Sequence, residues 1–292
     1  MKKQIPILLA ACVIVMAIVV FPQLTPRLTS SAHNLNASTM SGAKPDLIVD
    51  QAILRQHWVV RVEDFPAEFC SVQEGGITPG THAVVRFTVS TPNIGDADLI
   101  VGDPNAHVAA NDGLFEFASC HHHFHFRHYA LYELVNPTTG QVWRAAKRGF
   151  CMIDFDKYGA YPGPNNNERK YLDCGAPGEP GNQGISKGWA DTYVWKLAGQ
   201  FFLLDGGDGQ PPVPPGDYVI RITVNPGFIP SPDEPSTFAS PDPLHPGVFH
   251  QLLESDYENN VAQVTITIPT HPGRQGVGPL KNQPAITEEI ID

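Results

Sequence analysis

Five of the twelve histidines lie within eight residues, from His121 to His128, and this run is the part of the sequence best equipped for chemistry. On an extended strand His121, His123 and His125 would share one face, while His122 and the two intervening phenylalanines would share the other. At about 3.3 Å per residue, the outer two of the three would lie roughly 13 Å apart at the backbone. Three imidazoles therefore meet at one ion only if the strand bends or the rings converge.

Imidazole is a ligand for zinc, copper, iron and nickel, and three neutral histidines with open positions are typical of a catalytic metal site. The alternative is a surface histidine tract that takes up metal adventitiously. Aromatic residues surround the run, and an exposed tract would not need them: Phe115, Phe117, Phe124 and Phe126. The sequence therefore favours a built metal site.

The elements that must position this run are predicted to be strands. Inward and outward residues alternate with period two over 84–89, 218–224 and 264–268, and turn residues separate such segments. Glycine (26) and proline (28) are abundant, and no long helical pattern with caps appears. We expect an all-β fold, an antiparallel β-sandwich with long irregular loops at 158–188 and 225–250.

The charge of the chain restricts its partners. The 292 residues are 42% hydrophobic, enough for a core in one or two domains, and the formal net charge is -11. A negative field of this size repels nucleic acid and attracts cations. We therefore expect no nucleic-acid binding and a preference for cationic amines.

The N-terminus predicts export. Lys2 and Lys3 precede an apolar run over 5–21, and small residues follow at 30–32, so residues 1–32 are predicted to be a signal peptide or an N-terminal anchor. Lipidation at Cys12 is a weaker alternative, because the apolar run continues past it. The protein would be secreted or lie at the cell surface, with membrane contact only if this segment is retained.

Four cysteines remain beyond that segment: Cys70, Cys120, Cys151 and Cys174. In an oxidising compartment they predict two disulfides, and spacing alone leaves three connectivities open. A zinc site is the weaker interpretation, since no C-x-x-C pair occurs.

Four segments, in the same order along the chain, resemble the catalytic domain of the lysyl oxidase family: Cys120 to His125, Lys147-x-x-Phe150-Cys151, Asp191-Thr192-Tyr193, and the run Glu-Ser-Asp-Tyr-Glu-Asn-Asn over 254–260. The resemblance covers about Asp46 to Ile268. It implies a linker at 33–45, a lysyl oxidase-like catalytic domain at 46–268 and a tail after it, and we expect this tail, 269–292, to be mobile.

The resemblance implies a copper ion bound by His121, His123 and His125. It also implies a lysine tyrosylquinone cofactor formed from Lys147 and Tyr193. Copper and oxygen oxidise the tyrosine ring, the lysine amine adds to it, and the resulting carbonyl group condenses with a substrate amine. Removal of the α-proton and hydrolysis then release the aldehyde, with peroxide and ammonia as the other products.

Two further residues have candidate roles in this reaction. Asp191 is our choice for the base, because it lies two residues from Tyr193 and would share its face on a strand. A structural carboxylate is an equally good interpretation of Asp191. His128 is a candidate to orient a copper ligand or to transfer protons.

The run over 254–260 supplies carboxylate and amide oxygens, which are ligands that calcium prefers, although composition alone would favour a solvated acidic turn. The resemblance implies a calcium ion that joins the first and last strands and is held by Asp46, Leu47, Glu254, Asp256, Asn259 and Asn260. It also implies a disulfide between Cys120 and Cys174, which leaves Cys70 with Cys151.

Departures from the animal enzymes concern the surroundings of the site. One cysteine pair near Tyr193 is missing, with Trp189 and Trp195 in its place, and residues are added within 158–180 and 226–250. Such changes bear on access and on the choice of amine.

Two functions of different class follow. The first is a secreted copper- and quinone-dependent amine oxidase that converts primary amines, either lysine side chains or small amines, to aldehydes. The second is a non-catalytic secreted β-sandwich adhesion module that binds calcium and metal. A topaquinone-type oxidase is less favoured, because no Asn-Tyr-Asp or Asn-Tyr-Glu triplet is present. Lys147, Tyr193 and the three histidines favour the enzyme, since a binding module has no use for all five.

Overall fold

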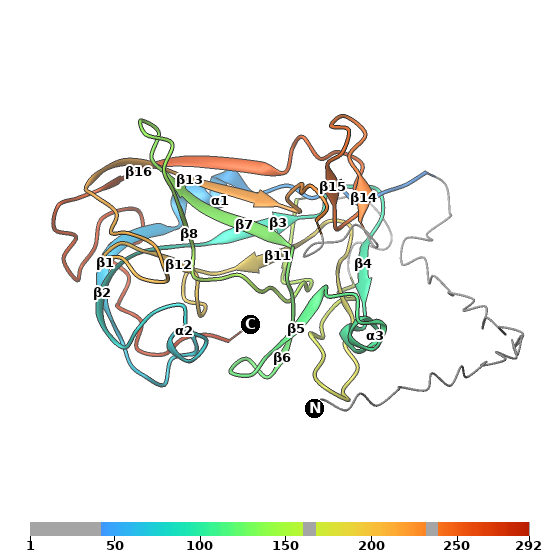
Figure 1. Ribbon diagram of the computed structural model, residues 1–292, viewed down its shortest axis with the longest axis horizontal. Coiled ribbons are helices and arrows are strands. Elements are labelled where there is room, and N and C mark those ends of the chain that lie inside the picture. Colours follow the sequence, from blue (N-terminus) through green and yellow to red (C-terminus); the bar gives the residue numbers. More distant parts are fainter. Residues whose placement is uncertain (1–41, 160–167, 232–238, 292) are drawn as a thin grey trace, which may run out of the picture. The chain divides into compact units, whose positions relative to one another are not determined.

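The computed structural model describes residues 42–159, 168–231 and 239–291 (Figure 1). The predicted signal peptide or anchor at 1–32 and most of the predicted linker lie outside these residues. Within them the chain forms three short helices and sixteen strands. None of these helices has the length and apolar character needed to cross a membrane.

A four-stranded antiparallel sheet in the order β16-β13-β7-β8 carries one side of the core. Its strands are β7 (Ala130–Val135), β8 (Val142–Arg144), β13 (Gly216–Val224) and β16 (Val261–Ile268). Burial alternates along β13 and β16, so one face packs inward and the other meets solvent. The period-two pattern predicted for these two segments is confirmed.

A second sheet, in the order β1-β2-β12, packs against the first. It contains β1 (Trp58–Phe65), β2 (Gly80–Phe87) and β12 (Phe201–Leu203). The ring of Phe87 on β2 stacks on Phe202 at 4.7 Å between centroids and meets Tyr132 of β7 edge-on at 5.5 Å. The two sheets therefore share one aromatic and aliphatic core.

The remaining strands form smaller antiparallel sheets that carry the site. One has the order β3-β11-β9, with β3 (Val89–Pro92), β9 (Asp156–Lys157) and β11 (Trp189–Tyr193). Three pairs complete the set: β4 (Leu99–Gly102) with β10 (Gln183–Ile185), β5 (Phe115–Ala118) with β6 (His123–Phe126), and β14 (Ser240–Pro241) with β15 (Phe249–His250). The expected all-β class is confirmed, but the strands are divided among several small sheets.

The three helices are short and locally capped. In α1 (Gln51–Gln56) the Asp50 side chain accepts from the first backbone N–H groups, and in α3 (Pro104–Ala110) Asp103 does the same. The remaining helix, α2 (Cys70–Gln73), has no side-chain cap, and a disulfide holds it at its first residue.

The structure corrects the expected disulfide pairing. Cys70 is bonded to Cys120 and Cys151 to Cys174, with Cα atoms 5.5 Å apart in each pair, in place of the pairs Cys120–Cys174 and Cys70–Cys151. The reason is the position of the β5-β6 hairpin. The turn of this hairpin contains Cys120 and lies beside α2. Cys151 instead follows Phe150, which bridges Phe126 of β6, and the neighbouring residue Phe124 of β6 donates to the carbonyl oxygen of Gly175, next to Cys174.

The segment after Pro269, for which we expected a mobile tail, packs on the domain. Val277 exchanges two backbone hydrogen bonds with Val60 of β1, at 2.8 and 2.9 Å. Further along, the Glu289 carboxylate accepts from the backbone N–H of Ser71 at 3.0 Å and lies 3.6 Å from Arg86. The structure thus places Val277 and Glu289 against the domain, and the mobility of 269–292 stays a prediction.

Candidate active site

The β5-β6 hairpin positions the histidine run. Ala118 pairs with His123 and Glu116 with His125, so these four side chains occupy one face of the hairpin. The phenylalanines occupy the other face, where cross-strand ring pairs lie 5.3 and 5.7 Å apart between centroids. The alternation predicted from the sequence therefore places His123 and His125 together and separates them from the aromatic side.

His121 reaches the same place by a different route. It lies in the four-residue turn before β6, not on the strand, and His122 after it has a left-handed φ of 61° and an exposed side chain. The turn brings the His121 ring to 4.8 Å from the His125 ring and 5.5 Å from the His123 ring, between centroids. On a straight strand His121 and His125 would lie too far apart to share one ion, and the bend in the chain at the turn brings their rings together.

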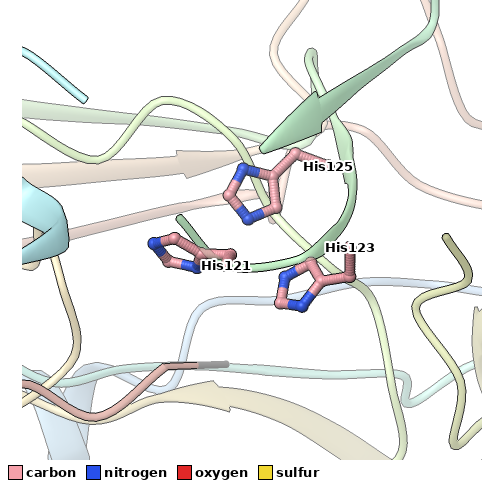
Figure 2. A group of neighbouring side chains, drawn as sticks. All are labelled: His121, His123 and His125. Carbon is pink, nitrogen blue, oxygen red and sulfur yellow. The ribbon is translucent and has the colours of Figure 1, made fainter. Parts of the chain in front are cut away.

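The three imidazoles form a compact group of donors. Each offers one ring nitrogen, and these atoms all lie within 4.8 Å of one another, around a common space in Figure 2. All three residues are at least nine-tenths buried. A close set of buried nitrogen donors fits a copper or zinc ion, because imidazole is a good ligand for both.

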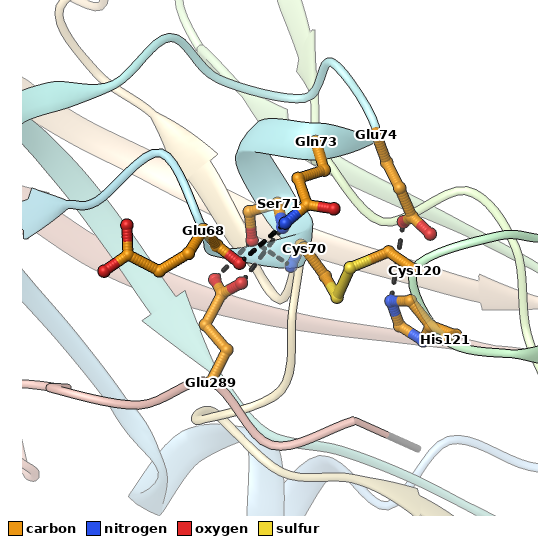
Figure 3. Close-up of a disulfide and its surroundings, with 9 residues drawn as sticks. Glu68, Cys70, Ser71, Gln73, Glu74, Cys120, His121 and Glu289 are labelled. Atoms are coloured by element: carbon orange, nitrogen blue, oxygen red, sulfur yellow. Dashed lines mark hydrogen bonds and ion pairs between the residues drawn. A yellow bond between two sulfur atoms is a disulfide. The ribbon is translucent and has the colours of Figure 1, made fainter.

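One neighbour of this group was missed by the sequence analysis. Glu74 follows α2, and its carboxylate lies 3.4 Å from His121 Nε2, next to the Cys70–Cys120 disulfide (Figure 3). A carboxylate beside a ligating histidine fixes its ring orientation and raises its basicity. Nothing in the sequence indicates this contact, because Glu74 lies far from the histidine run along the chain.

Lys147 lies on a segment clamped between two others. Its backbone N–H donates to Gly199 O at 2.8 Å, and Phe150 forms an isolated bridge with Phe126 of β6. Gly149 makes this packing possible, since a Cβ there would lie 2.8 Å from the His125 Cβ. The glycine between Lys147 and Phe150 therefore gives the His125 ring its space, which sequence spacing did not reveal.

The structure brings Lys147 and Tyr193 together. The Lys147 ammonium nitrogen lies 5.2 Å from the centroid of the Tyr193 ring and 5.7 Å from that of Phe150. Tyr193, at the end of β11, is 1% exposed, and its hydroxyl donates to Cys151 O at 2.9 Å. The fold thus closes a 46-residue separation and places an amine beside a buried phenol ring.

Asp191 and Tyr129 complete the buried surroundings of Tyr193. Asp191 is 2% exposed and lies two residues before Tyr193 on β11, so the two side chains share a face. The Tyr129 ring lies 6.4 Å from the Tyr193 ring, and its hydroxyl bonds to Thr91. Burial, and then the charge of Asp191, hold the pKa of Tyr129 well above its usual range.

Two cavities meet at Lys147. One of about 410 Å³ is lined by this lysine, by histidines of the group and by three acidic side chains: His121, His125, Glu74, Glu116 and Asp208. The other, of about 390 Å³, is lined by Lys147, His128 and three arginines: Arg127, Arg144 and Arg148. His128 therefore lines the second cavity, and its part in orienting a copper ligand or transferring protons stays a prediction.

The predicted calcium residues gather where the start of the domain meets the turn before β16. Leu47 N–H donates to Glu254 Oε2 at 2.5 Å, Asn260 Nδ2 donates to Glu254 Oε1 at 3.0 Å, and Asn259 Nδ2 donates to Asp46 Oδ1 at 3.0 Å. Asp256 differs, because its side chain is exposed and accepts from the backbone of the same turn.

Two features of this cluster fit a cation. The Oδ1 atoms of Asn259 and Asn260 are buried and have no hydrogen-bond partner among the described residues. Burial raises the pKa of Glu254 to about 8, although hydrogen bonds from Asn225, Leu47 and Asn260 act to lower this pKa. Orphaned amide oxygens beside a desolvated carboxylate are the oxygen donors that calcium takes.

Comparison with known proteins gives a consistent result. A family model described as Lysyl oxidase matches residues 66–232, more than half of the chain. Protein-lysine 6-oxidase from Rattus norvegicus is 25% identical over 242 residues, which is 78% of this chain and 47% of the rat protein. Lysyl oxidase homolog 1 from Homo sapiens is 26% identical over 235 residues, or 76% of this chain and 33% of the human protein. Lysyl oxidase homolog 2 from Gallus gallus is 25% identical over 233 residues, 76% of this chain and 24% of the chicken protein. The chain therefore spans about half the length, or less, of these relatives.

Proposed function

The chain belongs to the lysyl oxidase family, and we propose that it is a secreted copper- and quinone-dependent amine oxidase. It would convert primary amines, carried on protein lysines or on small molecules, to aldehydes, with release of peroxide and ammonia. The relatives named protein-lysine 6-oxidase support lysine side chains as one substrate class. The proposal covers the activity, the cofactors and the export of this chain.

The approach of Lys147 to Tyr193 is the observation that carries the proposal. An amine and a phenol that must join in a cofactor lie 5.2 Å apart, measured from the nitrogen to the ring centroid. Both side chains are buried, Lys147 at 7% exposure and Tyr193 at 1%. A non-catalytic adhesion module gains nothing from this arrangement.

We assign copper to His121, His123 and His125, whose nitrogens form the compact donor group. When bound there, copper with oxygen supplies the oxidation that prepares the Tyr193 ring for bonding to Lys147 as lysine tyrosylquinone. Glu74 would hold the His121 ring in place through the contact at its Nε2.

The cavity beside the histidine group would admit the substrate. Its lining includes Arg148, which pairs with Asp208, so Glu74 and Glu116 would be the carboxylates that favour a cationic amine, and the net charge of -11 adds a general attraction. Asp191 is our candidate for the group that takes the α-proton of the substrate, on a carboxylate oxygen, because it is buried on the same face of β11 as Tyr193. The closed packing around Tyr193 would keep bulk water from the reacting ring.

We propose further that Asp46, Leu47, Glu254, Asp256, Asn259 and Asn260 hold calcium. The ion would tie the entry of the domain to β16. Two disulfides agree with an oxidising, extracytoplasmic location.

The test is maturation of the full chain with copper in air. Phenylhydrazine should then develop the absorbance of a trapped quinone, and peptide mapping should find the peptides of Lys147 and Tyr193 joined. Lys147→Ala and Tyr193→Phe should each abolish the cross-link and amine turnover while copper stays bound.

Lys196→Ala is a matched control, because Lys196 also lies over an aromatic ring, 5.4 Å from the centroid of Trp195, but away from the histidine group. This variant should mature and turn over as the parent chain does. Full amine oxidation by the Tyr193→Phe protein would overturn the proposed function.

A further inference from the structure

A second group of metal-binding side chains lies apart from the histidine run and plays no part in the proposed function. Ligand atoms of Asp242, His245 and Glu258 lie within 4.8 Å of one another. Asp242 and His245 belong to the connection between β14 and β15, in the stretch where residues are added relative to the animal enzymes, and Glu258 lies in the turn before β16.

The carboxylate of Asp242 is fixed in direction. Its Oδ1 accepts from the backbone N–H groups of Leu244 at 2.7 Å and His245 at 3.0 Å. Its Oδ2 then faces two ring nitrogens, His245 Nδ1 at 3.0 Å and His250 Nε2 at 3.2 Å. Asp242 and the His250 ring in contact with it are 7% and 5% exposed, so this donor is built into the protein and not displayed on its surface.

His250 links the Asp242 carboxylate to the backbone. Its Nδ1 lies 2.8 Å from the carbonyl oxygen of Asn225, which only accepts, so Nδ1 carries a hydrogen. Its Nε2 lies 3.2 Å from Asp242 Oδ2. The ring therefore helps to fix the direction of Asp242, as a hydrogen-bonded neighbour of a ligating carboxylate does.

Stacking keeps this ring in its orientation. The His250 ring lies 3.9 Å from the ring of Tyr257, with 6° between their planes. The ring that orients Asp242 is therefore fixed before any ion arrives.

The spacing of three donors fits a single ion. Ligands about 2.0–2.1 Å from a tetrahedral zinc ion lie roughly 3.3 Å from one another. The Asp242 oxygen lies 3.0 Å from His245 Nδ1, which lies 3.6 Å from Glu258 Oε1, and ligand atoms of all three residues lie within 4.8 Å of one another. We propose that Asp242, His245 and Glu258 form a second site for a divalent ion of the zinc class, with His250 as the residue that orients Asp242.

An ion pair alone accounts for less of this arrangement. His82 and Asp205 show what such a pair looks like in this protein: a single 3.0 Å contact between a ring nitrogen and a carboxylate at the surface. The group at Asp242 adds a second carboxylate, that of Glu258 in the turn before β16. The ion would fasten the added connection to the turn that also carries the proposed calcium residues.

The test uses the full chain in the His123→Ala background, which disables the histidine group and isolates the second site. The metal-free protein, kept in calcium, is titrated with zinc by calorimetry and bound zinc is counted after desalting. One zinc ion per chain is expected, and cobalt in its place should give the intense visible absorption of a tetrahedral site.

Adding His245→Ala should weaken this zinc binding by more than about 100-fold, since loss of a ligand exceeds the 10–100-fold effect of losing a ligand's hydrogen-bond partner. His245 is about half exposed, so its removal does not threaten the fold. Adding His82→Ala instead should leave one bound zinc ion. The proposal is overturned if the His123→Ala chain binds no zinc, or if the His245→Ala change leaves zinc bound. Neither result touches the amine oxidase proposal, which rests on Lys147 and Tyr193.

Discussion

Replacing Gly149 with alanine should break the histidine group without altering any ligand. The backbone at Gly149 does not have a positive φ, so alanine is otherwise compatible with this position. The added Cβ would lie 2.8 Å from both Cβ and Cγ of His125. Carbon atoms pack at about 3.5–4.0 Å, so the ring or the Lys147 segment must move by roughly 1 Å.

A shift of that size is large for a metal site, where ligand distances hold to about 0.2 Å. We expect copper affinity to fall by at least about 100-fold, or about 2.8 kcal/mol at 1.4 kcal/mol per tenfold. Crowding should also lower the free energy of unfolding by about 1–3 kcal/mol. Copper binding is measured by competition with a chromophoric chelator, and stability by denaturant unfolding of the metal-free chain.

Gly184→Ala separates the two effects. A Cβ at Gly184 would crowd the Leu99 backbone oxygen and lie 2.7 Å from the Tyr171 ring, neither of which belongs to the histidine group, so stability should fall while copper affinity stays unchanged. If folded Gly149→Ala protein bound copper as tightly as the parent chain, the role given to this glycine and the placement of His125 in the site would both be wrong.

Three further results are expected. Removing calcium with a chelator that spares copper should lower the melting temperature, since an ion at 100 times its Kd stabilises the fold by about 2.7 kcal/mol. In Glu254→Gln, calorimetry should find the same melting temperature with and without calcium. Replacing Cys70 and Cys120 by serine should lower the free energy of unfolding, measured with denaturant, by about 4 kcal/mol, because it removes a cross-link of sequence separation 50. The same change should weaken copper binding, and unchanged copper binding would show that α2 does not support His121. Hydrogen bonds from Arg274 and Thr81 lower the pKa of Asp64 to about 2, so the Asp64–Arg274 pair stabilises the fold above the unfolded pKa and this stabilisation is lost as pH falls through 2. The pKa of Asp64, measured by NMR titration, should rise towards 3.8 in Arg274→Ala. An unchanged pKa would mean that Arg274 does not hold the C-terminal segment on β1.

The sequence by itself determined the features that depend on near neighbours in the chain. Alternation along β13 and β16 predicted which side of each strand is buried, because successive side chains on a strand point to opposite faces. The same rule separated His123 and His125 from the phenylalanines of the hairpin. The order of motifs also pointed to the family, which the match over 66–232 shows.

Only the tertiary structure decided the features that join distant segments. Periodicity has no information on which cysteine lies beside Cys70, since the answer depends on where the β5-β6 turn packs against α2. The same packing places Glu74 beside His121, and the left-handed backbone of His122 in the turn brings the His121 ring close to His123 and His125. The meeting of Lys147 with Tyr193 likewise follows from hydrogen bonds that clamp one segment between two others. Such contacts are set by the closure of long loops and the fit of side chains in a shared core, and neither quantity can be read from local spacing.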